Sequence, residues 1–200
     1  MPRPQCPRCQ RPETHCLCPL IPHLASRTRV LLLQHPSEVS HALNTARLAA
    51  LGLANAELRV GERFADLADT LADPDYRACL LFPGEAARPV GEMGATDPRP
   101  LLLVVPDGTW RKARKLLYLN PELQALPRVT LPEGLTSRYR LRKAPMAGAL
   151  STLEAIVAAL DIVEAPARYD DLLRPFEALI QGQIEAMGEE TFRKNHGDGE

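Results

Sequence analysis

Four of the five cysteines of this 200-residue chain lie within thirteen consecutive residues, in the pattern Cys6-x2-Cys9-x6-Cys16-x-Cys18. Four thiolates at this spacing can surround one tetrahedral zinc ion and leave no open position for water. Two disulfides are the alternative, but nothing in the sequence suggests export, and such close neighbours bridge poorly. We therefore expect a structural zinc site bound by these four cysteines. His15 could replace one of them, but four thiolates make it unnecessary.

A second group of residues with chemical potential follows an apolar run, at Pro106-Asp107-Gly108-Thr109-Trp110. A carboxylate at a strand end can act as a general base, or it can build an Asx turn. Trp110 is the single tryptophan, and an indole beside cations is typical of a surface that stacks nucleobases and binds phosphates. A capped helix with a solvated basic face is the alternative. The cations expected to bind RNA are Arg111, Lys112, Arg114 and Lys115.

The net charge of −1 hides a strong segregation of charge along the chain. Residues 1–29 carry a net +4 and residues 107–143 a net +6, whereas residues 161–200 carry a net −6. Phosphate binding needs local cations and not a high overall isoelectric point. No apolar run is long enough to cross a bilayer and the N-terminus lacks a signal-peptide pattern, so we expect a cytoplasmic protein.

The elements that must position these groups are indicated by short apolar runs alternating with helical patterns. The expected strands cover residues 29–34, 56–60 (at an edge), 77–82, 100–105 and 128–131. The expected helices cover residues 40–51, 64–71, 110–119, 153–160 and about 170–187. Strands that are apolar throughout predict an α/β fold with a mainly parallel sheet and helices on both faces. Cys79, inside such a run, is expected to be a core thiol.

Sites in parallel sheets lie at the carboxyl ends of the strands, where this chain has Phe82-Pro83-Gly84-Glu85 and the loop around Asp107. We expect a four-cysteine zinc module in residues 1–28, a catalytic domain in residues 29–195 and a frayed tail in residues 196–200.

The Asp-x-Thr-Trp sequence resembles the signature of the DTW-domain family, and the resemblance extends over nearly the whole chain. Six elements occur in the family's order. They are the cysteine cluster with Arg11-Pro12; Glu38 with Asn44-Thr45; Phe82-Pro83; Val104–Lys115; Ser137-x-Tyr139-Arg140-Leu141-Arg142; and Thr152-x-Glu154-Ala155. A single tetrapeptide would be weak evidence, whereas six ordered elements are strong evidence.

The resemblance implies a SPOUT-like fold, with an α/β knot near the C-terminus that cradles the cofactor. It also implies an enzyme that moves the 3-amino-3-carboxypropyl group of S-adenosylmethionine to N3 of a uridine in tRNA. The residues then expected to bind the cofactor are Pro83, Gly84, Glu85, Pro106, Gly108, Thr109, Tyr139, Arg140, Thr152 and Glu154. Further RNA contacts are expected from Arg138, Arg142 and Lys143.

In that reaction Asp107 is the candidate general base, and Trp110 is expected to pack on the target uracil or to wall the cofactor. Each has a structural alternative: an Asx turn for Asp107 and a cap on the core for Trp110. Glu154 could hold the cofactor's amine or favour the first turn of a helix, and Arg140 or Arg142 could clamp its carboxylate. His35 and His41 are interpreted as structural.

Three other functions stay open from the sequence. The nearest are transfer of the same group to ribosomal RNA, and methyl transfer by a SPOUT-type enzyme. A non-catalytic zinc-containing RNA-binding protein would share the cysteine cluster and the basic helix, but it has no use for an acid at position 107. The expected partners are tRNA and S-adenosylmethionine, with no membrane, and the oligomeric state is left open.

Overall fold

A computed structural model describes residues 4–94, 97–138 and 150–188. Its centre is a sheet of six parallel strands in the order β2-β1-β5-β3-β6-β4. The strands are β1 (Arg29–Gln34), β2 (Ala56–Val60), β3 (Arg77–Leu81), β4 (Arg88–Pro89), β5 (Leu101–Asp107) and β6 (Arg128–Thr130). The predicted parallel sheet is therefore confirmed, with β2 at one edge.

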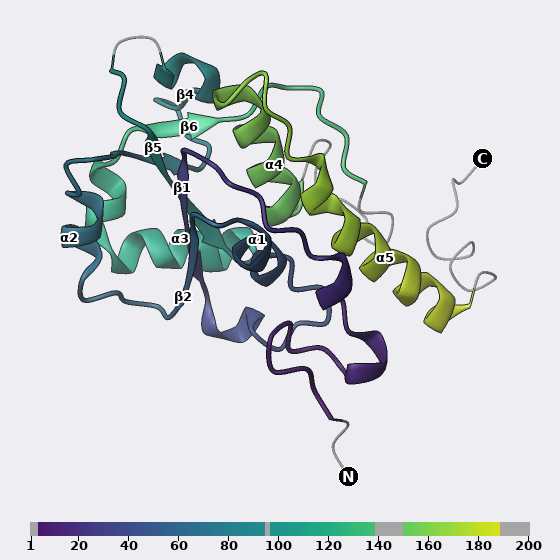
Figure 1. Ribbon diagram of the computed structural model, residues 1–200. Helices are drawn as coiled ribbons and strands as arrows, with labels where there is room; N and C mark the ends of the chain where they lie inside the picture. The colour runs from purple at the N-terminus through teal and green to yellow at the C-terminus, as the bar shows by residue number, and fades with distance from the viewer. Residues whose placement is uncertain (1–3, 95–96, 139–149, 189–200) are drawn as a thin grey trace, which may run out of the picture.

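The alternation of side chains along each strand divides the core into two clusters, one on each face of the sheet. Leu31 and Leu33 of β1 pack in one cluster with α2 (Leu67–Leu71) and α3 (Trp110–Leu119). Val30 and Leu32 of the same strand pack in the other cluster with α1 (Ala46–Gly52), α4 (Thr152–Val163) and α5 (Arg174–Met187). Figure 1 shows α4 and α5 on one side and α2 and α3 on the other. Helices cover both faces, as predicted.

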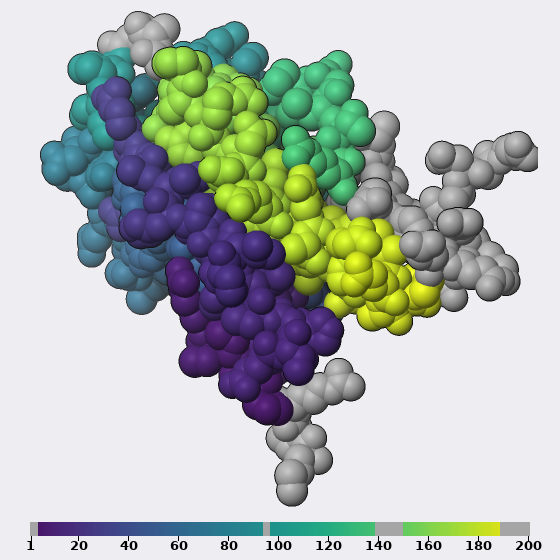
Figure 2. Space-filling view, turned by 45° about the vertical axis from the view of Figure 1, so that its right-hand side comes forward, coloured from purple at the N-terminus to yellow at the C-terminus, as the bar shows by residue number. Residues whose placement is uncertain are grey.

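The N-terminal segment has little regular structure apart from short 3₁₀ helices at Glu13–His15 and Cys18–Leu20. It packs along the α4 and α5 side of the molecule, as the purple surface beside the green and yellow one shows in Figure 2. Leu17 and Ile21 belong to the same apolar cluster as Phe176 of α5. The cysteine-rich segment therefore shares a core with the α/β part of the chain.

The helix predicted over residues 40–51 is correct only in its second half, because α1 begins at Ala46. The Asn44 side chain explains the late start. Its Nδ2 donates to the carbonyl oxygens of Glu38 and Val39, at 3.2 and 3.4 Å, while its Oδ1 accepts from the backbone N–H of Arg47 at 3.3 Å. An asparagine that bonds the backbone on both sides holds a turn before it and starts the helix after it.

Several other bounds differ from the prediction. The third apolar strand continues to Asp107, so the carboxylate lies on the last residue of β5 and not in the following loop. The last helix is preceded by a separate 3₁₀ turn at Asp170–Leu173. The two-residue β4 was not predicted. The predicted knot and tail depend on residues 139–149 and 189–200, which lie outside the described residues. Across the described ranges, no helix is long and apolar enough to span a bilayer.

Candidate active site

The candidate site lies at the carboxyl end of β5, in the middle of the sheet, between β1 and β3. A central strand of a parallel sheet ends in a crevice formed by the loops of its neighbours. Figure 1 shows how the N-terminal ends of α3 and α4 approach this edge from opposite faces. The sheet therefore brings together residues that are more than one hundred positions apart.

The Asp107 carboxylate is almost completely enclosed and is hydrogen-bonded through both oxygens. Thr152 Oγ1 donates to Oδ1 at 2.5 Å and Gln34 Nε2 donates to Oδ2 at 2.7 Å. Only 8% of Asp107 is exposed. Burial raises the pKa of this carboxyl above its ordinary value, and the two hydrogen bonds counteract part of the rise. Through these two hydrogen bonds the carboxylate bridges β1 and α4.

Gln34, at the end of β1, extends this polar network toward the loop after β1. Its side chain exchanges hydrogen bonds with that of Asn44, at 3.1 and 3.4 Å, and Gln34 is fully buried. Sequence reasoning missed Gln34, because a polar residue at the end of an apolar run marks only a strand end. The signal that could have found it is its alignment with Asp107, directly across from it on β5.

The turn after Asp107 depends on glycine. Gly108 has φ +149°, and a Cβ there would lie 3.1 Å from the Cβ of Lys112. Thr109 then accepts a hydrogen bond from the Lys112 N–H at 3.4 Å, which confirms it as the N-cap of α3. His35 donates its backbone N–H to the Asp107 carbonyl at 3.0 Å and pairs with Glu62 at 2.8 Å, which agrees with its structural interpretation.

A cleft opens beside this network, between the ends of β3 and β5 and the start of α4. Its volume is about 140 Å³, below the range typical of a pocket that holds a whole ligand. The residues lining it include the predicted cofactor residues Pro83, Pro106, Gly108 and Thr152, together with Trp110. Within the described residues, Gly84, Glu85, Thr109 and Glu154 do not line it. Tyr139 and Arg140 lie outside the described residues.

Glu154 has a well-defined structural role at the start of α4. Its carboxylate accepts from the Ser151 N–H at 2.8 Å and Ser151 Oγ accepts from the Glu154 N–H, which forms a capping box. The same carboxylate accepts from Ser137 Oγ and from the Arg138 N–H, at 2.9 and 2.6 Å. These hydrogen bonds connect Glu154 to the chain that follows β6. The expected contact between Glu154 and the cofactor's amine stays a prediction.

Trp110 stands at the rim, 41% exposed, where the two strand ends meet. Its ring contacts Phe82 edge to face, with centroids 5.7 Å apart. Trp110 therefore walls the cleft on one side while part of its surface faces solvent. A second hollow lies against it, lined by Phe82, Pro83, Gly84, Trp110, Arg114, Leu117, Tyr118, Gln124 and Arg128.

The basic residues of α3 fall into two groups. Lys112 pairs with Glu38 at 2.6 Å and Lys115 with Glu62 at 2.9 Å, so both charges are compensated within the protein. Arg111 and Arg114 are exposed and form no ion pair with any described residue. Arg138 pairs with Glu177 at 2.6 Å. Arg142 and Lys143 lie outside the described residues.

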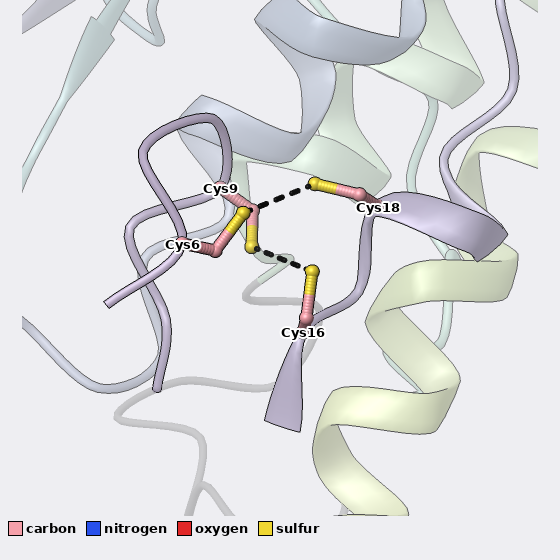
Figure 3. Close-up of side chains that lie close together, drawn as sticks. All are labelled: Cys6, Cys9, Cys16 and Cys18. Carbon is pink, nitrogen blue, oxygen red and sulfur yellow. Dashed lines mark hydrogen bonds between the residues drawn. The ribbon is translucent and has the colours of Figure 1, made fainter. Parts of the chain in front are cut away.

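The four N-terminal cysteines converge as the sequence predicted. Their sulfur atoms all lie within 4.8 Å of one another, with Cys6–Cys18 at 3.6 Å and Cys9–Cys16 at 3.8 Å, and none forms a disulfide. Figure 3 shows the sulfurs directed at a common centre. Four ligands at the usual Zn–S distance of about 2.3 Å would lie roughly 3.8 Å apart, so the cluster fits a tetrahedral zinc ion.

The environment of the cluster acts differently on its thiols. The N–H groups of Cys9 and Arg8 lower the pKa of the Cys6 thiol to about 6, whereas burial and the neighbouring thiols raise the pKa of Cys18 to about 12. Outside the cluster, Cys79 is fully buried in β3, and burial raises the pKa of its thiol to about 12, as expected of a core cysteine.

Arg11, inside the cysteine segment, ties it to the loop after β1. Its Nη1 donates to the Ala42 carbonyl at 2.6 Å and its Nη2 to the Asn44 carbonyl at 3.1 Å. Asn44 in turn contacts Gln34 and, through it, Asp107. The cysteine cluster and the carboxylate are therefore joined by a continuous series of hydrogen bonds.

The model of one protein family, the DTW domain, matches residues 3–184. The chain is 32% identical over 203 residues to tRNA-uridine aminocarboxypropyltransferase 2 of Macaca fascicularis, covering 97% of this chain and 68% of that protein. It is 35% identical to the Mus musculus protein of the same name, covering 92% of this chain and 64% of that protein.

The Drosophila melanogaster protein of that name is 34% identical over 210 residues, which cover 97% of this chain and 82% of the fly protein. The chain thus spans about two thirds of the length of the two mammalian relatives and more of the fly relative. No solved structure matches it.

Proposed function

Since this chain belongs to the DTW domain family, we propose that it is a tRNA-uridine aminocarboxypropyltransferase. The observation that carries the proposal is that several relatives with this activity in their names match over nearly the whole chain, and that the family model covers both the cysteine cluster and the end of β5. In the reaction, a bond forms between uridine N3 and Cγ of S-adenosylmethionine. The Cγ–S bond breaks, methylthioadenosine leaves and the N3 proton is lost.

S-adenosylmethionine is proposed to bind at the cleft beside Trp110. Its sulfonium activates three carbons, so orientation alone must present Cγ to the base. The first turn of α4 borders the cleft, and its Thr152 and Leu153 N–H groups, which have no partner among the described residues, are proposed to bind the cofactor's carboxylate. The described walls suit a part of the cofactor, and the remaining contacts proposed from the family resemblance are Gly84, Glu85, Thr109, Tyr139, Arg140 and Glu154.

Asp107 is proposed as the base that receives the N3 proton. Its raised pKa brings it closer to that of the weakly acidic imide, which improves the match between donor and acceptor. To act, the carboxylate must exchange one of its two present partners, and Thr152 is at the cleft while Gln34 is fully buried. The Thr152 hydroxyl is therefore the partner that substrate would displace.

Transfer RNA is the proposed partner, with contacts from Trp110, the four α3 cations and the basic residues Arg138, Arg142 and Lys143. The family resemblance also supports a SPOUT-like knot, and an experimental structure that traces residues 139–149 would test it. We further propose that zinc fills the cysteine cluster as a structural ion, that residues 1–28 form its module beside a catalytic domain at 29–195, and that the protein acts in the cytoplasm.

The decisive experiment supplies purified protein, a tRNA transcript and S-adenosylmethionine labelled either in the carboxyl carbon or in the methyl group. Carboxyl label in the RNA, release of methylthioadenosine and a uridine of increased mass by nucleoside mass spectrometry would support the proposal. Transfer of methyl label would indicate a methyltransferase instead. Transfer to a ribosomal RNA fragment but not to tRNA would change the substrate. RNA binding without any transfer would indicate a binding protein.

A further inference from the structure

The hollow on the outer side of Trp110 is separate from the cofactor cleft and is larger. Its volume is about 540 Å³, within the range of small-ligand pockets. Trp110, Phe82 and Pro83 line both spaces and form the partition between them. Whatever fills this hollow lies against one side of the partition while the cofactor lies against the other.

One wall of the hollow is a stripe along α3. Trp110, Arg114 and Tyr118 recur at intervals of four residues, which places them one above another on a single face of the helix. Trp110 is 41% exposed and Tyr118 is 79% exposed, which is unusual for large rings on a short helix. Two exposed rings with a guanidinium between them suit planar, anionic ligands more than an apolar partner.

The opposite wall supplies a second cation. The Arg128 guanidinium lies 5.8 Å from the centre of the Phe82 ring, and its Nη1 donates to the Pro83 carbonyl at 3.5 Å. Gly84 makes room for it, because a Cβ at that position would lie 2.7 Å from Nη1. Arg128 is thus held at the edge of the hollow by an aromatic face and a backbone carbonyl.

The charge of the hollow is uncompensated. Its described lining contains two arginines and no acidic residue, and neither Arg114 nor Arg128 has an ion pair with any described residue. By contrast, Lys112 and Lys115 of the same helix each form an ion pair with a glutamate of the protein, as expected of cations with a structural role. An anion with a flat aromatic part would satisfy both the rings and the arginines.

We propose that this hollow binds the RNA strand adjacent to the target uridine, with the neighbouring base stacked on Trp110, the base beyond it on Tyr118 and the phosphate that joins them between Arg114 and Arg128. The inference rests on the proposed function, since it needs an RNA substrate. The partition explains the choice of a neighbour over the target itself, because a base in the hollow is screened from the cofactor cleft by Trp110. Stacking there would leave the next base at the rim, facing the cofactor.

The chain contains its own probe for this site, because Trp110 is its single tryptophan. Quenching of Trp110 fluorescence by a five-nucleotide single-stranded RNA, without cofactor, should report stacking directly. Tyr118→Ala should weaken the binding on the order of tenfold, and Tyr118→Phe should retain it. The Arg114→Gln/Arg128→Gln double variant should reduce the log–log salt slope by about 0.7, since the two arginines hold one phosphate and each single-strand phosphate contact contributes about 0.7.

Arg174→Gln is the matched control, because Arg174 is an exposed arginine on α5, on the other face of the sheet. Turnover provides the second readout. The hollow variants should raise KM for tRNA while the affinity for S-adenosylmethionine stays within twofold of the parent's. Unquenched Trp110 fluorescence in the parent protein, or Tyr118→Ala and the double arginine variant binding RNA like the parent, would overturn the proposal. Quenching that depends on these residues, with no group transfer by the parent protein, would support the hollow and reject the proposed function.

Discussion

The cysteine cluster and the polar network around Asp107 are both groups of four side chains, yet they are assembled in opposite ways. The cysteines come from thirteen consecutive residues, in a segment whose helices are two short 3₁₀ turns. The network joins Gln34, Asn44, Asp107 and Thr152, and two of its hydrogen bonds connect residues 73 and 45 positions apart. We expect the proposed zinc ion to hold the first group, whereas the second is held by the sheet.

This difference teaches where stability and chemistry are located in the molecule. A local cluster whose ligands repel one another when ionised gains its structure from the metal. A buried network gains its geometry from packing, so its members can be changed one at a time while the fold persists. Substitutions in the two regions should therefore fail in different ways.

The largest effect is expected for Cys9→Ser, or for chelation of the parent protein. Binding free energies of structural zinc are about 10–16 kcal/mol in small modules, and loss of one ligand removes much of this. Metal analysis should find one zinc per parent chain and little in the variant, and limited proteolysis should cut the first 28 residues. Cys79→Ser is the control, because that thiol is buried in β3 away from the cluster. If the parent protein is purified without chelator and contains no zinc, the proposed zinc site is contradicted.

The next largest effect is expected for Asp107→Asn, which should lower turnover by about 10²–10⁴-fold. The amide can accept from Gln34 and donate to the Thr152 hydroxyl, so the loop and the cofactor affinity should be preserved while the proton acceptor is lost. Steady-state kinetics with a measured cofactor affinity separates these effects. Turnover within a few-fold of the parent's would remove Asp107 from the chemistry and leave it as a bridge between β1 and α4.

A smaller effect is expected for Thr152→Val, which keeps the shape but removes the donor to Asp107 Oδ1. Leaving one oxygen of a buried carboxylate without a partner costs about 1–3 kcal/mol, so the free energy of unfolding in urea should fall by that amount. Thr152→Ser keeps the hydroxyl and is the matched comparison. Equal stability of the valine and serine variants would mean that water replaces the hydroxyl and that the network is not closed.

The smallest effect is expected for the free energy of unfolding of Asp107→Asn, which should rise slightly and not fall. Because burial raises the pKa of Asp107, the ionised carboxylate costs the folded state free energy above the ordinary pKa of an aspartate. The variant should therefore be slightly more stable than the parent at neutral pH. This advantage should disappear as the pH falls below about 4, where the carboxyl is protonated in both states. Chemical denaturation across this pH range measures it, and a variant less stable at neutral pH would contradict the sign.

The two regions also differ in how far the sequence predicted them. The cysteine cluster follows from spacing alone, and the parallel sheet follows from the continuous apolar runs such as Leu31–Leu33. The start of α1 could not be predicted in this way, because it depends on hydrogen bonds between the Asn44 side chain and the backbone on both sides of it. The compensation of Lys112 and Lys115 was also hidden, since their partners Glu38 and Glu62 are 74 and 53 positions away. Local chemistry is visible in a sequence, whereas pairing across the sheet needs the fold.

The hydrogen bonds of Arg11 give the cysteine cluster a consequence for the distant carboxylate. With the segment folded, the guanidinium holds the Ala42 and Asn44 carbonyls, and the loop after β1 has few conformations available. When the segment unravels, that loop loses these two bonds and regains conformational entropy, and Asn44, the partner of Gln34, is then held only by its bonds to neighbouring residues. The supply of metal would then change the fraction of molecules in which the network is formed, because that fraction depends on the occupancy of the cluster. The sheet and the Asp107 carboxylate would stay in place throughout.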